Sequence, residues 1–111
     1  MNAVAKTLTE LSDYAGLSGM DVANVTEVSK ATVSRWTTGK ASPQPRTQLI
    51  LSDLHYVANR LRDFYTPAEV RVWLYGRNDL LDGKSAMELI NENRTEDVLA
   101  AIERLGALAY L

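Results

Sequence analysis

The sequence contains no cysteine, which excludes disulfide bonds, thiolate metal sites and cysteine nucleophiles and is typical of a protein of the reducing cytoplasm. It also lacks any apolar run near the roughly 20 residues that a membrane span requires. The first residues, from Met1 to Tyr14, carry charges and hydroxyl groups where a signal peptide would be apolar. We therefore expect a cytoplasmic protein with neither a membrane segment nor a targeting segment.

Groups with catalytic chemistry are equally scarce. The only histidine, His55, stands beside Tyr56 inside a long predicted helix, a setting typical of a polar or half-buried helix residue. The sequence has no Ser/His/Asp set and no glycine-rich phosphate loop. Asp79 and Asp82 flank a loop rich in turn residues, where carboxylates are common, and two carboxylates are too few for a calcium site. We expect no enzyme activity, no metal and no cofactor.

Acidic residues are missing from one long segment. None of the 14 lies between Glu27 and Asp53, although the net charge of the chain is −2. Four of the 12 basic residues fall in that gap: Lys30, Arg35, Lys40 and Arg46. Chance clustering on a solvated face would also produce such a gap, so the interpretation of the gap depends on the sequence motif that it contains.

Helix signals dominate the chain, and strand signals are weak throughout. The length fits one domain, or two very small ones that share a core. Caps, glycines and apolar periodicity predict helices at about 4–15, 18–25, 30–38, 46–65, 67–75 and 86–91, and a last helix capped by Thr95. The apolar positions expected to face inward on the two longest helices are Leu49, Ile50, Leu54, Val57, Ala58 and Leu61, then Val98, Leu99, Ile102, Leu105, Leu108 and Ala109. Trp73 and Tyr75 are also expected in the core, with a place at an interface as the alternative.

A helix-turn-helix pattern fills the segment without acidic residues. From Met20 to Gly39 the sequence reads MDVANVTEVSKATVSRWTTG. Ala23 is small where two helices would cross, and Ser29 is a predicted N-cap. The apolar positions expected to pack between the helices are Val22, Val28, Val33 and Trp36.

The remaining side chains of the second helix would then face the major groove of DNA. The predicted DNA-binding residues are Ser29, Lys30, Ala31, Thr32, Ser34, Arg35, Lys40 and Arg46. Arg35 suits either a guanine edge or a phosphate, whereas Lys40 and Arg46 suit phosphates. Arg46 has an alternative interpretation as an ordinary charge in the first turn of a helix.

Over roughly residues 1–62 this pattern resembles the helix-turn-helix of the Xre/phage-repressor superfamily, whose members generally bind DNA as dimers. The resemblance rests on Ala23, Val28-Ser29, Thr32-Val33-Ser34-Arg35-Trp36 and Gly39-Lys40 followed by Pro43. Glu27 occupies the turn position that is usually glycine. Either Glu27 adopts a positive φ, at a cost of about 1 kcal/mol, or the turn is longer or differently shaped.

From about Thr66 the sequence resembles the toxin-binding C-terminal domain of the MbcA/ParS/Xre antitoxin family. The residues that carry this resemblance are Trp73, the run from Leu80 to Ile90, then Val98, Ile102 and Gly106. Ala86 stands where the family usually has proline. Asn91-Glu92-Asn93 replaces a usual glycine, and asparagine tolerates similar backbone angles.

The resemblance implies an all-α fold with an Xre-like helix-turn-helix bundle over residues 1–65 and a small helical domain of the toxin-binding type over 66–111. It implies an antitoxin that represses its own operon and occludes a RES-type toxin, an NAD-consuming enzyme, with its C-terminal part. The partners would be double-stranded DNA, this toxin and a second copy of the chain, and the protein would be nucleoid-associated when bound to DNA. The predicted toxin-binding residues are Ala107, Leu108, Tyr110 and Leu111.

Alternatives remain at this point. Leu108 and Leu111 would instead finish the core stripe of the last helix if the tail does not insert into a partner. The chain would be a stand-alone phage or prophage DNA-binding regulator or DNA-organising protein if no toxin accompanies it. A third possibility is an interaction module with vestigial DNA binding. A neighbouring gene for a RES-type protein would separate the first reading from the other two.

Overall fold

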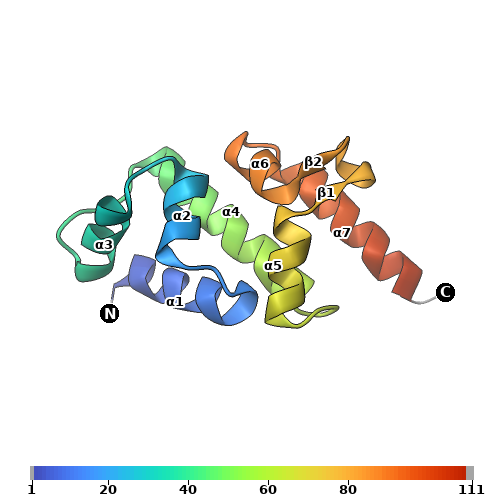
Figure 1. Ribbon diagram of the computed structural model, residues 1–111, viewed down its shortest axis with the longest axis horizontal. Coiled ribbons are helices and arrows are strands. Elements are labelled where there is room, and N and C mark those ends of the chain that lie inside the picture. Colours follow the sequence, from blue (N-terminus) through green and yellow to red (C-terminus); the bar gives the residue numbers. More distant parts are fainter. Residues whose placement is uncertain (1, 110–111) are drawn as a thin grey trace.

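The computed structural model describes residues 2–109, which form seven α-helices, one short 3₁₀ helix and a minimal pair of strands (Figure 1). The elements in chain order are α1 (Ala3–Ala15), α2 (Gly19–Thr26), α3 (Lys30–Thr38), α4 (Pro45–Leu61), α5 (Pro67–Tyr75), β1 (Arg77–Asn78), η1 (Asp79–Leu81), β2 (Lys84–Ser85), α6 (Ala86–Asn91) and α7 (Thr95–Ala109). The predicted all-α class is confirmed. Within the described part of the chain, no helix has both the length and the apolar character needed to cross a bilayer.

Local capping chemistry sets most of the helix ends. Gly16 ends α1 in the left-handed region at φ 63°, where glycine has no Cβ to clash. Ser18 is the N-cap of α2, and Thr66 is the N-cap of α5; the side chain of each accepts a hydrogen bond from the backbone N–H three residues later. In both cases the acidic residue at that third position bonds back to the cap, which completes a capping box.

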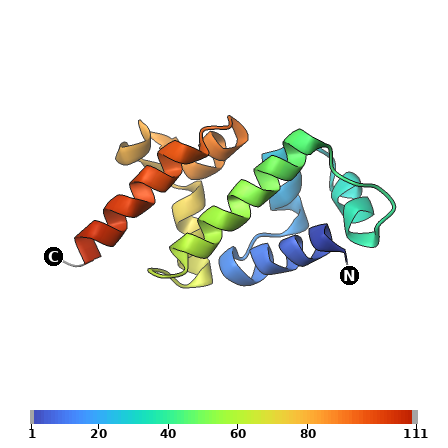
Figure 2. The ribbon, with the colours of Figure 1, turned by 180° about the vertical axis from the view of Figure 1, so that it is seen from behind.

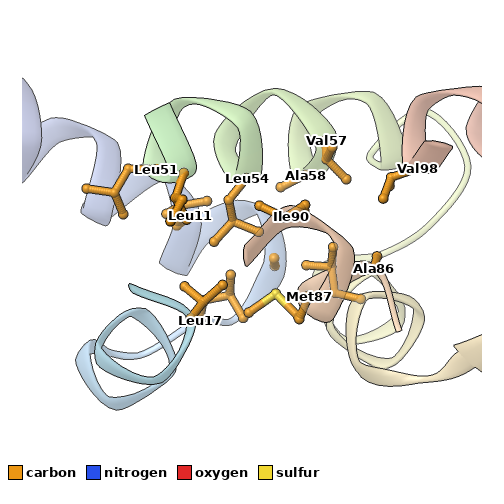
Figure 3. Close-up of a cluster of buried hydrophobic side chains, with 14 of the residues drawn as sticks. Leu11, Leu17, Leu51, Leu54, Val57, Ala58, Ala86, Met87, Ile90 and Val98 are labelled. Carbon is orange, nitrogen blue, oxygen red and sulfur yellow. The ribbon is translucent and has the colours of Figure 1, made fainter. Parts of the chain in front are cut away.

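A single hydrophobic cluster joins residues from both halves of the chain, and α4 runs along it (Figure 3). Leu51, Leu54, Val57 and Ala58 of α4 belong to this cluster. The first half adds Leu11 and Leu17, and the second half adds Ala86, Met87, Ile90 and Val98. The helix-turn-helix part therefore shares its core with the segments that follow it.

The molecule is elongated, with extents of 48 × 23 × 19 Å. In Figure 1 the long axis is horizontal, and α3 lies at one end of it while the C-terminal end of α7 lies at the other. The view from behind shows the same separation, with α4 and α7 as the two long helices (Figure 2).

Several predictions about individual elements are wrong. The long helix ends at Leu61 rather than Tyr65, and an unpredicted antiparallel strand pair brings Arg77 opposite Ser85. Thr95 is the first residue of α7, and its hydroxyl donates to Asp53 at 2.9 Å, so it ties α7 to α4.

The inward-facing positions are mostly, but not entirely, as predicted. Ile50, Leu54, Val57, Ala58 and Leu61 are buried in α4, and Val98 and Ile102 are buried in α7. Leu49 is 48% exposed and Leu108 is 63% exposed, so neither finishes a core stripe. The interpretation of Leu108 as a core residue is therefore wrong. Tyr75 is 41% exposed, and Trp73 is partly buried against the core.

Candidate nucleic-acid interface and C-terminal surface

The helix-turn-helix is formed by α2, the turn at Glu27 and α3. Ala23, Val33 and Trp36 are buried where these helices pack together and against the rest of the core. Ser29 caps α3 by accepting a hydrogen bond from the backbone N–H of Thr32 at 3.1 Å. The predicted packing and the predicted cap are both confirmed.

The turn itself contains a left-handed residue. Glu27 has φ 59° and ψ 42°, and its backbone N–H donates to the carbonyls of Ala23 and Asn24. The turn therefore keeps the geometry that usually calls for glycine, which decides between the two alternatives that the sequence left open. The same reasoning holds at Asn93, which has φ 62° where the family usually has glycine.

One face of α3 is open to solvent and carries the predicted DNA-binding side chains. Ser29, Lys30, Ala31, Ser34 and Arg35 are exposed, and Thr32 is half-buried. Arg35 donates to the hydroxyl of Thr32 at 3.2 Å, and that hydroxyl also lies 2.9 Å from the hydroxyl of Ser29. The structure thus gathers a guanidinium and two hydroxyls near the N-terminal end of α3, where the helix dipole also favours phosphates.

The two outlying basic residues differ in their surroundings. Lys40 is exposed just after α3. Arg46 is exposed in the first turn of α4, and its guanidinium donates to the backbone carbonyl of Asn91 at 3.3 Å. Arg46 therefore has a structural contact in the second half of the chain, which the sequence did not predict.

Asn2, for which the sequence analysis predicted no role, lies close to the end of α3. Its side-chain oxygen caps α1 by accepting from the N–H of Ala5, and its side-chain NH₂ donates to the carbonyl of Trp36 at 3.2 Å. Its position directly before an apolar helix was the available signal for the cap. Trp36 lies 34 residues after Asn2 in the sequence, so no local pattern predicts the contact between them.

The C-terminal end of α7 carries the described part of the predicted toxin-binding segment. Ala107 and Leu108 are exposed, whereas Tyr110 and Leu111 lie outside the described residues. A mainly apolar hollow of about 400 Å³ lies along α5, lined by Tyr65, Ala68, Glu69, Val72 and Trp73.

A buried carboxylate between the two halves was not predicted. Asp21 is 7% exposed and accepts hydrogen bonds from the guanidinium of Arg71 at 2.7 and 3.1 Å and from the hydroxyl of Tyr75 at 2.5 Å. Burial alone would raise the pKa of Asp21, but the hydrogen bonds from Arg71, Tyr75 and Ser18 outweigh it and hold this pKa well below its ordinary value. Burial and the bond to the Asp21 carboxylate raise the pKa of Tyr75 to about 12.

The groups considered for catalysis or metal binding do not converge. Among the residues that the structure describes, no three His, Cys, Asp or Glu side chains come together in a way that could hold a metal ion. His55 is partly buried, with Nε2 3.5 Å from a carboxylate oxygen of Glu10 and its ring tilted against Tyr14. The hydrogen bond from Tyr14 lowers the pKa of Glu10. This arrangement joins α1 to α4.

Comparison with known proteins agrees with the geometry. A family described as a helix-turn-helix domain matches residues 3–64. The chain is 36% identical over 96 residues to the probable mycobacterial cidal antitoxin Rv3188 of Mycobacterium tuberculosis, covering 86% of this chain and 82% of that protein. It is 29% identical over 106 residues to the mycobacterial cidal antitoxin MbcA of M. tuberculosis and of Mycobacterium bovis, covering 96% of this chain and 94% of MbcA.

A solved structure extends the similarity to the whole fold. The crystal structure of the M. tuberculosis MbcT–MbcA toxin–antitoxin complex contains a chain that matches this one with a TM-score of 0.79 and 29% sequence identity. The match covers 93% of both chains, so it includes α5 to α7 as well as the helix-turn-helix.

Proposed function

Because this chain belongs to the MbcA family of antitoxins and carries a helix-turn-helix domain, we propose that it represses its own operon by binding operator DNA through α3. The observation that carries this proposal is the open face of α3, where Arg35 and Lys30 stand in a segment without acidic residues. A helix presented in this way fits the major groove.

The proposal gives the exposed residues separate tasks. Arg35 reads a base edge or grips a phosphate, and Ser29, Lys30, Ala31, Thr32 and Ser34 contact the groove around it. Lys40 and Arg46, which both follow α3 in the chain, hold phosphates. Two copies of the chain bind two half-sites, because helix-turn-helix proteins read palindromic operators as dimers. The protein then acts in the cytoplasm, on the nucleoid when DNA is bound.

The second part of the proposal is a toxin partner of the RES type, which is an NAD-consuming enzyme. Residues 66–111 of this chain occlude the active site of that toxin. Support comes from the MbcT–MbcA complex, in which a similar chain is bound to a toxin. Support also comes from Leu108, which is 63% exposed at the end of the molecule opposite α3. A leucine so exposed on a helix end is available to insert into a partner together with Ala107, Tyr110 and Leu111.

The decisive experiment compares two variants in cells that express the toxin encoded next to this gene. The first lacks residues 107–111, and the second combines Arg35→Ala with Lys40→Ala. We expect the first to bind the promoter duplex but to fail in protecting the cells, and the second to protect them without binding the duplex. Leu49→Ala is the matched control, because Leu49 is also a half-exposed leucine but lies on α4.

The opposite pattern, with protection by the shortened chain and none by the Arg35/Lys40 variant, would reject occlusion of the toxin by the C-terminal end. If no toxin gene or toxin protein accompanies this chain, the stand-alone DNA-binding regulator becomes the better account of its function.

A further inference from the structure

The second half of the chain holds α2, the first helix of the helix-turn-helix, at its N-terminal end. Arg71 of α5 donates two hydrogen bonds to the carboxylate of Asp21, and Tyr75 of α5 donates a third. Arg71 also donates to the carbonyl of Gly16 at 3.2 Å, the residue that ends α1. One guanidinium therefore binds the end of α1 and the start of α2 together.

A second contact holds α2 at its other end. The side-chain NH₂ of Asn91, the last residue of α6, donates to the carbonyl of Val25 at 2.8 Å. Val25 lies two residues before Glu27, so this bond reaches the start of the helix-turn-helix turn. The backbone carbonyl of Asn91 also accepts the hydrogen bond from Arg46. Asn91 thus contacts both α2 and a residue of the proposed DNA face.

These contacts contribute more to the orientation of α2 than to the free energy of unfolding. Only the carboxylate of this ion pair is buried, whereas the side chain of Arg71 is 43% exposed, so water screens part of the attraction and the net gain in stability is small. A bidentate arginine–carboxylate contact adds geometric specificity, because both N–H···O bonds form together only over a narrow range of relative placements of the two groups. Since α2 has only eight residues and packs directly on α3, its placement determines how α3 is presented.

We propose that Arg71, Tyr75 and Asn91 are positioning residues for DNA recognition, through which α5 and α6 set the placement of α2 and thereby of α3 on the operator. This inference rests on the proposed DNA binding and goes beyond it, because all three residues lie outside the segment matched by the helix-turn-helix family. Specific DNA binding is then a property of the whole chain and not of residues 1–65 alone.

The test compares Arg71→Met, Tyr75→Phe and Asn91→Ala with the unmodified full-length chain. Asn91→Ala removes the bond to Val25 but keeps the backbone carbonyl that accepts from Arg46. The matched control is Thr95→Val, which also removes a hydrogen bond between distant helices, from Thr95 to Asp53, but touches neither α2 nor α3. Dissociation constants are measured on the promoter duplex and on a random duplex, at a temperature where circular dichroism shows every variant folded.

We expect Arg71→Met and Asn91→Ala each to weaken binding to the promoter duplex about 10-fold, comparable to the loss of one base contact. Tyr75→Phe, which removes a single hydrogen bond, should show a smaller loss. Binding to the random duplex and the salt dependence should stay unchanged, because the basic residues that contact phosphates remain. Thr95→Val should match the unmodified chain on both duplexes.

The inference is overturned if Arg71→Met and Asn91→Ala bind the promoter duplex as the unmodified chain does, or if they lose affinity equally for both duplexes. If Arg71→Met fails to fold, Asn91→Ala and Tyr75→Phe decide the matter by the same criteria. If the unmodified chain itself does not distinguish the promoter duplex from the random one, the proposed function fails, and that result is distinct from a failure of the positioning role alone.

Discussion

Replacing Glu27 with glycine should make this protein more stable. Glu27 is exposed and left-handed, at φ 59° and ψ 42°, and its backbone N–H closes the C-terminal end of α2. Within residues 2–109, its side chain makes no hydrogen bond or ion pair that the substitution would remove. The change therefore acts almost entirely on the backbone.

The size of the gain follows from two opposing contributions. A left-handed conformation costs an ordinary L-residue about 1–2 kcal/mol, which glycine avoids. Glycine loses about 0.5–1 kcal/mol of additional chain entropy on folding. The free energy of unfolding of Glu27→Gly should therefore rise by roughly 0.5–1 kcal/mol, which in a chain of this length corresponds to an increase in Tm of about 2–4 °C.

Thermal and urea unfolding, followed by circular dichroism, measure this difference. Glu27→Ala is the control, because it removes the charge but keeps the Cβ atom and should bring no gain. Asn93→Gly should gain less than Glu27→Gly, since Asn93 is also left-handed at φ 62° but asparagine tolerates that region. A lower Tm for Glu27→Gly, or an equal gain for Glu27→Ala, would refute the assignment of backbone strain to this turn.

Three further outcomes are expected. Arg35→Ala should weaken promoter binding by about 1–3 kcal/mol if Arg35 reads a base. Lys40→Ala should weaken binding to all DNA sequences and flatten the salt dependence of binding. Titration of each variant with DNA at several salt concentrations measures these two effects. Because the pKa of Tyr75 is raised to about 12, its stabilising contribution is complete below pH 10 and is lost as the pH rises from 10 toward 12. Tyr75→Phe should therefore flatten the dependence of the unfolding free energy on pH in that window. The change should be at most about 1 kcal/mol, because Tyr75 is 41% exposed and water screens the interaction. Leu108→Ala should change the unfolding free energy by less than about 0.5 kcal/mol, while Leu54→Ala should cost about 2–5 kcal/mol, and similar losses in urea unfolding would show that Leu108 is buried.

The parts of the fold that the sequence predicted are those set by local chemistry. Ser29 and Thr66 cap helices through bonds to backbone groups three residues away, so a short window of sequence contains all the relevant atoms. Gly16 and Gly39 end helices through their own backbone conformation. The left-handed turn at Glu27 was open to prediction only because the family usually has glycine at that position.

The parts that the sequence did not predict depend on distant partners. Leu49 and Ile50 are adjacent and equally apolar, and only the packing of neighbouring helices decides that Ile50 is buried and Leu49 exposed. The local sequence places Asp21 as the third helical residue of a capping box, and it has that role in the structure. Its second role depends on Arg71, 50 residues later, and no periodicity or motif connects the two.

The shape of the molecule determines which variants can separate its two proposed activities. The open face of α3 and the exposed Leu108 lie at opposite ends of a molecule 48 Å long, so the two proposed binding surfaces do not overlap. Surface changes at either end are therefore expected to affect one activity only. Arg71 lies between them and bonds to Asp21 in the helix-turn-helix, so a change at Arg71 reaches α2 without touching the face of α3. Loss of DNA binding after a change in the C-terminal half therefore has to be traced to α5 and α6 before it is attributed to the C-terminal end of α7.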